Sequence, residues 1–276
     1  MQIREYSLPN GWYPRDSDGI HQFLAEFVRS GSCCRAAIAP HAGWYYSGRV
    51  AARSCSRFDP HAETIVVLGG HLPGGAPPLF AMEDAARTPL GPMPIDAEFR
   101  SVLFNKLGGE EDRYRDNTVE ALLPMVRFYF PDAMLLWLRL PADMKSFKAG
   151  GVIASAAAKL NRKINVLAST DLTHYGRNYG FSPHGSGKAA LRWVREVNDA
   201  NFINAVESGN SDEVLRRAEK DNSACSAGAV LGAMGFAEAE GLGRARLLEY
   251  ATSAAVNDED GEVPDSFVGY AAMEFG

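Results

Sequence analysis

Short, uninterrupted apolar runs alternate along this chain with longer stretches of mixed polarity. Four of the runs have the length and composition of buried strands: residues 36–39, 65–68, 134–140 and 164–168. Between them lie stretches of helical length, among them residues 48–58 and 145–160. This alternation predicts βαβ units. We therefore expect an α/β fold with a central, mostly parallel sheet flanked by helices.

The two ends of the chain and one internal stretch follow other patterns. Near the start, Asp18 can cap a helix with one buried stripe, formed by Ile20, Phe23, Leu24, Phe27 and Val28. A further helical stretch is expected at 119–130. At the other end, residues 246–252 and 267–275 form two strands around the acidic segment 258–262. These strands either pair with each other or join the main sheet.

Composition narrows the class of protein. The 276 residues contain no low-complexity linker and no internal repeat, so residues 1–276 are expected to form one domain. The 28 basic and 34 acidic side chains give a net charge of −6, and the basic ones are scattered. Nucleic-acid binding normally needs a basic stripe and is not expected.

Membrane and secretion signals are also missing from the sequence pattern. No apolar run is long enough to span a membrane, and the first residues lack the core of a signal peptide. The four cysteines do not have the spacing of a secreted disulfide scaffold: Cys33, Cys34, Cys55 and Cys225. We expect a cytoplasmic protein with reduced cysteines. The oligomeric state cannot be read from the sequence.

Histidines follow three of the four predicted strands. His41 comes after residues 36–39, His71 after 65–68, and His174 shortly after 164–168. In open α/β sheets the carboxyl ends of the strands meet at one edge, and ligands bind there. We therefore expect these histidines to share a pocket.

Each of the first two histidines has two interpretations. His41 either binds a ligand or takes part in catalysis, or it makes a local structural hydrogen bond. His71 is either a ligand or a solvated loop residue. Gly69 and Gly70 precede it and would let the backbone approach a bound group closely.

Asp171 and His174 are separated by three positions in the sequence. One helical turn would place them on the same side, where the carboxylate could orient the imidazole. Such a pair suits general acid–base catalysis. The alternative is an aspartate that caps a helix beside a hydrogen-bonded histidine.

Cys225 lies at the expected start of a helix that continues through residues 229–239. Asp221, Asn222 or Ser223 could cap this helix, and a thiol in the first turn is stabilised as thiolate, the form that binds metals. Cysteine is also a good small filler in an alanine-rich helix. Spacing alone favours this packing role.

Several motifs resemble one known family over nearly the whole chain. They are Gly-Trp-Tyr at 11–13, Pro-His-Ala-Gly at 40–43, Thr-Pro-Leu-Gly at 88–91, Asp-Leu-Thr-His-Tyr at 171–175, Ala-Cys at 224–225 and Gly-Tyr-Ala-Ala at 269–272. In this order they resemble the Memo family, which includes the AmmeMemoRadiSam system protein B group. The resemblance implies a fold like that of the class III extradiol, or LigB-like, dioxygenases.

The same resemblance implies a metal site and a chemistry. Two histidines and a cysteine form the metal pocket of the family, which correspond here to His41, His71 and Cys225. Asp171 and His174 would flank this pocket, with His174 in the place of the acid–base histidine. The implied function is a metal-binding protein that acts as an Fe(II)- or copper-dependent dioxygenase-like oxidoreductase on a small phenolic substrate. Softer ligands such as thiolate also admit zinc.

Two alternative functions stay open at this point. The pocket could bind a metal or another ligand without turnover, as a binding or signalling protein on the same fold. With zinc, it could instead activate water for hydrolysis. Three departures from the family pattern mark a divergent member. The turn at 69–72 is Gly-Gly-His-Leu and is one residue short, Asn117 replaces a histidine, and Ser226 replaces a glycine.

Overall fold

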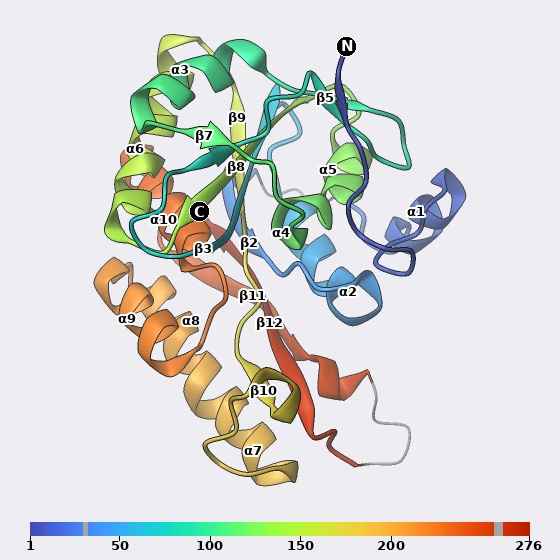
Figure 1. Ribbon diagram of the computed structural model, residues 1–276, viewed down its shortest axis with the longest axis vertical. Helices are drawn as coiled ribbons and strands as arrows, with labels where there is room; N and C mark the ends of the chain where they lie inside the picture. Colours follow the sequence, from blue (N-terminus) through green and yellow to red (C-terminus); the bar gives the residue numbers. More distant parts are fainter. Residues whose placement is uncertain (30–32, 257–261) are drawn as a thin grey trace.

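Four parallel strands form the centre of the main sheet in a computed structural model, which describes residues 1–29, 33–256 and 262–276. Their order across the sheet is β2 (Ala36–Ala39), β9 (Ile164–Ser169), β3 (Thr64–Leu72) and β8 (Met134–Pro141) (Figure 1). All four contain the apolar runs predicted from the sequence. Helices cover both faces of these strands, which is why the runs are continuously apolar and do not alternate with polar residues.

The edges of the sheet are antiparallel, so the whole sheet is mixed. Strand β12 (Ser266–Phe275) pairs antiparallel with β2, and it also pairs with β11 (Ala245–Thr252) and β10 (His174–Gly176). The two C-terminal strands thus pair with each other and also join the main sheet. The acidic segment expected between them lies largely outside the described residues, at 257–261.

Short strands complete the other edge and a separate small sheet. Strand β4 (Leu79–Phe80) pairs antiparallel with β8 and parallel with β7 (Glu110–Glu111). The small sheet consists of β1 (Ile3–Arg4), β5 (Ala85–Ala86) and β6 (Met93–Pro94). In the described residues, the main sheet contains nine strands.

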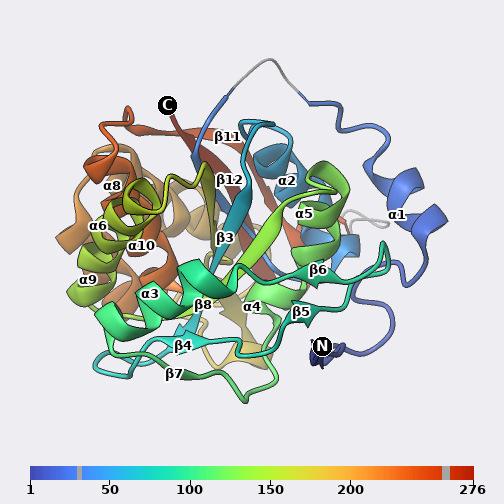
Figure 2. The ribbon, with the colours of Figure 1, turned by 90° about the horizontal axis from the view of Figure 1, so that it is seen from above.

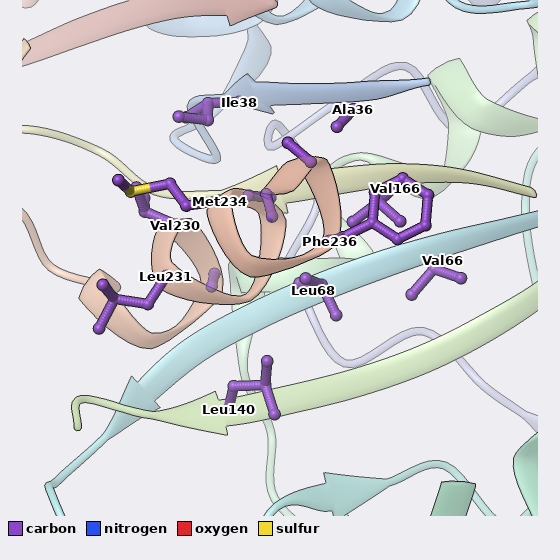
Figure 3. Packing of buried hydrophobic residues seen from close by; sticks show 14 of the residues in the cluster. Ala36, Ile38, Val66, Leu68, Leu140, Val166, Val230, Leu231, Met234 and Phe236 are labelled. Carbon is purple, nitrogen blue, oxygen red and sulfur yellow. The ribbon is translucent and has the colours of Figure 1, made fainter. Parts of the chain in front are cut away.

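One face of the sheet is covered by helices from the second half of the chain and by α3. Figure 3 shows α10 lying across β2, β9, β3 and β8, with Phe236 close to Val66 and Val166 of the strands. A Cβ on Gly150 would lie 2.2 Å from the carbonyl oxygen of Gly232, so glycine is needed where α6 approaches α10. The helices on this face are α3 (Ala97–Leu107), α6 (Met144–Lys159), α8 (Asp199–Glu207), α9 (Ser211–Asp221) and α10 (Ala227–Ala239).

The other face is covered by helices from the first half of the chain (Figure 2). Alternate residues of each strand point to the two faces, so Val66 and Leu68 belong to the first core and Ile65 and Val67 to the second. The helices here are α1 (Ser17–Leu24), α2 (Trp44–Cys55), α4 (Asn117–Glu120) and α5 (Leu123–Tyr129). Helix α7 (Gly187–Trp193) and the π-helical turn Val194–Asn198 lie near β10 at the far end of the molecule (Figure 1).

Three helix boundaries differ from the sequence prediction. Helix α1 is capped by Asp16 and not Asp18, since Asp16 Oδ1 accepts the Gly19 N–H at 2.8 Å. It ends at Leu24, so Phe27 reaches the core from an irregular segment and Val28 is 79% exposed. The stretch expected as one helix at 119–130 is divided into α4 and α5, with a proline in the first turn of α5. The helix expected at 48–58 begins four residues earlier and ends at Cys55.

Within residues 1–29, 33–256 and 262–276, no helix is both long enough and apolar enough to cross a membrane.

Candidate metal centre

Three side chains converge where the parallel strands end. His41 follows β2 by two residues, His71 lies near the end of β3, and Cys225 comes just before Ser226, the N-cap of α10. One possible ligand atom from each lies within 4.8 Å of the others. His41 Nε2 lies 3.3 Å from Cys225 Sγ. Strand β9 separates β2 from β3, yet the two imidazole rings are only 5.1 Å apart between centroids.

His41 is fully enclosed and held at several points. Its Nδ1 lies 2.8 Å from the hydroxyl of Ser169, which stands beside Ala39 in the pairing of β2 with β9. Its main-chain N–H donates to Asp171 Oδ1 at 2.7 Å, and its carbonyl accepts from Asn117 Nδ2 at 3.1 Å. These contacts fix the ring so that Nε2 is directed at the thiol of Cys225.

His71 is held by a carboxylate, in a backbone conformation that is uncommon for a non-glycine residue. Its Nδ1 lies 2.9 Å from Asp116 Oδ2, and its φ angle is +58°. The preceding glycines make close contacts within the chain. A Cβ on Gly70 would lie 2.4 Å from the Cβ of Ser226, and one on Gly69 would lie 2.3 Å from Thr118 Oγ1.

Asp116 is a neighbour of the candidate site that the sequence analysis did not predict. Arg139 Nη2 lies 3.2 Å from its Oδ2, and Thr118 donates to its Oδ1 through both the main-chain N–H and the hydroxyl. Burial would raise the pKa of Asp116, but the hydrogen bonds from His71 and Thr118 and the charge of Arg139 lower it to about 2. Asp116 is therefore a stable anion that can hold the Nδ1–H of His71 and leave Nε2 available. No sequence motif links Asp116 with His71.

Cys225 lies outside the helix that was expected to contain it. Helix α10 begins at Ala227, whereas Asp221 ends α9 and Asn222 caps it. The cap candidates at 221–223 thus belong to the end of the previous helix and the connection. The thiol does not depend on the first helical turn for its ionisation. Burial would raise the pKa of Cys225, but the neighbouring His41 and His71 imidazoles lower it well below its usual range.

The short distances between these side chains also shift the pKa values of the two imidazoles. Burial opposes the charged form of His71, yet the hydrogen bonds to Asp116 and Cys225 raise its pKa to about 10. The pKa of His41 is also raised, because the charges of Asp171 and Cys225 outweigh its burial. In the absence of a metal, these shifts favour a thiolate beside protonated imidazole. A metal ion would displace these protons.

Asp171 and His174 do not form the predicted hydrogen-bonded pair. The segment between them is not helical, because the chain passes from β9 through irregular backbone into β10. His174 Nδ1 lies 3.1 Å from the carbonyl oxygen of Leu172, and Asp171 is turned toward His41. Both side chains nevertheless line the same cavity of about 680 Å³.

Sequence comparisons identify the family to which the chain belongs. A family model described as "Memo-like protein" matches residues 4–274. The chain belongs to the Memo-like family. A MEMO1 family protein from Methanopyrus kandleri is 31% identical over 248 residues, covering 86% of this chain and 82% of the relative. Another from Methanosarcina mazei is 27% identical over 283 residues, covering 99% of both chains.

A solved structure supports the fold of this Memo-like chain. The crystal structure of an uncharacterized protein from Escherichia coli K12 aligns with a TM-score of 0.50 and 13% sequence identity. The alignment covers 87% of this chain and 99% of the other. At this identity the likeness shows the fold alone, and the relation to LigB-like enzymes stays a prediction.

Proposed function

We propose that this Memo-like protein binds one transition-metal ion through His41, His71 and Cys225. The main observation behind the proposal is that the Nδ1 atom of each imidazole contacts a protein side chain outside the cluster. Ser169 holds Nδ1 of His41 and Asp116 holds Nδ1 of His71, which leaves one nitrogen of each ring for the shared point. Histidines that bind metals are usually fixed in this way by hydrogen bonds from their other nitrogen.

The donor set agrees with the metals expected from the sequence. Two imidazole nitrogens and one thiolate suit Fe(II), copper or zinc better than they suit magnesium or calcium. We propose Fe(II) as the resident ion. Bound there with an open coordination position, Fe(II) would supply the oxygen-activating chemistry of a dioxygenase-like oxidoreductase.

The residues around the cavity would hold the substrate and move its protons. Asp171 and Asn117 line the cavity of about 680 Å³ and both contact His41, and the cavity has the size of a small-molecule site. His174 lines it, and the Leu172 carbonyl engages its Nδ1, so Nε2 is the nitrogen that can exchange a proton with a bound molecule. We propose that the substrate is a small phenolic compound and that His174 is the acid–base residue.

The test begins with elemental analysis of protein purified without oxygen. Wild type is compared with Cys225→Ala and His41→Ala, and with two controls, Cys33→Ser and His61→Ala, which remove an exposed thiol and an exposed imidazole outside the cluster. We expect one equivalent of metal in wild type and the controls, and none in the two site variants. Wild type that takes up no iron, copper or zinc would contradict the metal site.

The catalytic part of the proposal needs a second measurement. Oxygen uptake with phenolic compounds is recorded for the iron-loaded wild type and for His174→Gln. We expect uptake that depends on Fe(II) and falls in the variant while its metal content is unchanged. Metal binding without turnover on any phenol would identify a binding protein, and turnover without oxygen would identify a hydrolase.

A further inference from the structure

A second, smaller cavity borders His174 and one of the proposed metal ligands. Its volume is about 350 Å³, compared with about 680 Å³ for the cavity described above. Besides His174, two segments line it: the turn after β10, with Tyr179 and Phe181, and the connection between α9 and α10, with Ala224 and Cys225. The turn after β10 is held in place by the ring of Phe181, which packs beside Tyr175 and Trp193.

The two cavities meet the cluster through different residues. Cys225 lines the smaller cavity, whereas none of the three proposed ligands is among the described residues that line the larger one. The larger cavity instead reaches the cluster through Asp171 and Asn117, which both contact the main chain of His41. Cys225 in turn donates its main-chain N–H to the Asp171 carbonyl at 3.2 Å. The cluster therefore borders both cavities.

Two aromatic rings separate the cavities from each other. Among the described residues, His174 and Tyr179 are the two that line both cavities. Their rings are in edge-to-face contact, with centroids 4.9 Å apart. The His174 ring is also fixed by the contact of its Nδ1 with the Leu172 carbonyl at 3.1 Å. Rings at this distance are in van der Waals contact and leave no passage between them, so each cavity reaches the cluster from its own side.

We propose that the smaller cavity is the route by which a second, small reactant reaches the cluster while the organic substrate occupies the larger cavity. This inference rests on the proposed function, in which the small reactant is dioxygen and the substrate is a phenol. Tyr179, Phe181 and Ala224 contribute apolar surface to the smaller cavity, which suits an apolar diatomic molecule. Separate routes let both reactants be present together, and Tyr179 is the residue that keeps them apart.

Alkylation of Cys225 in the metal-free protein measures this access without catalytic turnover. Iodoacetamide is the probe, and peptide mass spectrometry separates labelling of Cys225 from labelling of the exposed Cys33. Ala224→Phe narrows the smaller cavity and Ala42→Phe narrows the larger one, and each alanine is adjacent in sequence to a proposed ligand. We expect Ala224→Phe to slow the labelling about tenfold and Ala42→Phe to change it by less than about twofold.

Two results of this comparison would overturn the proposal. Equal slowing by the two variants would mean that the cavities are not separate. Unchanged labelling in Ala224→Phe would mean that the probe enters elsewhere, for example past His71, whose side chain is 33% exposed. Thermal unfolding checks that the variants fold. Ala224 is partly buried against the core, so Ala224→Leu, with a smaller side chain, provides the same comparison if Ala224→Phe does not fold.

The role of Tyr179 is tested in the narrowed protein. Adding Tyr179→Ala to Ala224→Phe should restore labelling to within about threefold of wild type, because the probe then enters from the larger cavity. Tyr179→Phe keeps the ring and should restore nothing. Adding Ala42→Phe to the restored protein should slow the labelling again, which shows that the recovery does not come from widening of the smaller cavity alone. Labelling that stays fast in this last protein overturns the role of Tyr179.

The identity of the small reactant is tested in the iron-loaded protein. The KM for dioxygen should rise about fivefold in Ala224→Phe, with the KM for phenol little changed, and Ala42→Phe should show the opposite pattern. The reverse assignment overturns the proposal.

The same proteins separate this inference from the proposed function. Wild type that binds metal, together with unchanged labelling of Ala224→Phe, contradicts the access route alone. Wild type that binds no metal, together with slowed labelling of Ala224→Phe, contradicts the metal site and leaves Cys225 as a thiol reached through the smaller cavity.

Discussion

Two polar clusters lie near the carboxyl ends of the central strands, and they differ in where their polar atoms point. In the proposed metal cluster, His41 and His71 each use one ring nitrogen for a neighbour in the protein and direct the other toward Cys225. In the second cluster, Asp199 accepts from the main-chain N–H and the hydroxyl of Thr173 and from Tyr250 Oη at 2.7 Å. The second cluster satisfies itself, and the first leaves ligand atoms facing a common point.

Because its polar atoms are all used within the protein, we interpret the Asp199 cluster as a structural network and not as a binding site. Asp199 is fully buried, and a Cβ on Gly269 would lie 2.0 Å from its Oδ2, so no space for a ligand exists on that side. Asn198, at the end of the π-helical turn, donates to the Thr173 hydroxyl at 2.9 Å. We interpret this network as a support for the segment that leads into β10. Burial of ionisable groups alone therefore does not identify a functional site, whereas convergence of available ligand atoms does.

The largest expected effect breaks the metal cluster itself. In Cys225→Ser, the hydroxyl is a far poorer ligand than thiolate, and the protein should lose its stoichiometric metal entirely. Competition with a coloured chelator measures the remaining affinity, and thermal unfolding of the metal-free proteins checks the fold. Cys55→Ser serves only to compare stability, because Cys55 is buried in the core away from the cluster. Retention of metal by Cys225→Ser would contradict the ligand assignment.

The second effect concerns Asp199 and pH. Burial raises the pKa of Asp199 to about 7, above the value of 3.8 of an unperturbed aspartate, despite its hydrogen bonds to Thr173 and Tyr250. The folded state thus holds a proton that the unfolded state has released. The associated stability is fully present below pH 4 and is lost as pH rises through 7. Between pH 5 and pH 8 the free energy of unfolding should fall by roughly 2–3 kcal/mol from this group.

Urea unfolding of wild type and Asp199→Asn at several pH values isolates this contribution. The variant should lack that part of the pH dependence, because its amide does not titrate, and its metal content should equal that of wild type. If the two proteins show parallel pH profiles, Asp199 does not hold the proton. If the variant loses its metal, the two clusters are not independent.

The strands that position the site were predicted from the sequence more accurately than the local conformation of the site residues. Continuous apolar runs identified the four central strands, and the rule for parallel strands then placed His41 and His71 at one edge. The start of α10 was harder to predict, because Ser223 and Ser226 are both acceptable caps and only packing decides between them. The spacing of Asp171 and His174 suggested one helical turn, but β10 pairs with β12 there and extends the chain.

The long-range partners of the proposed ligands could not be predicted from the sequence. Asp116 contacts His71 across 45 residues of sequence, and it also forms an ion pair with Arg139 of β8. Neither residue lies in a periodic pattern that would mark it. Such contacts follow from loop geometry, which a single sequence does not specify.

A smaller effect on metal affinity is expected from Asp116→Asn, which tests whether Asp116 positions His71. The amide keeps the size of the side chain but removes the charge that holds the Nδ1–H of His71. Metal affinity should fall by about 10- to 100-fold, the range usual for such partners. The measurement is chelator competition at constant pH. Glu111→Gln is the control, because it neutralises an exposed carboxylate in the same region that contacts only Arg113 among the described residues. An unchanged affinity would mean that His71 does not depend on Asp116.

The smallest effect is expected at Asn117, where related proteins carry a histidine by the resemblance described above. Here its amide donates to the His41 carbonyl at 3.1 Å and also lines the cavity. Asn117→Ala removes one neutral hydrogen bond behind His41, a loss of about 1 kcal/mol, so metal affinity should fall less than tenfold. Asn117→His restores the family residue and should recover that affinity if its ring reaches the same carbonyl. A loss of metal affinity comparable to that of Cys225→Ser would instead indicate that Asn117 itself binds the metal. The distinction between residues that bind the metal and residues that only position them would then be wrong for Asn117.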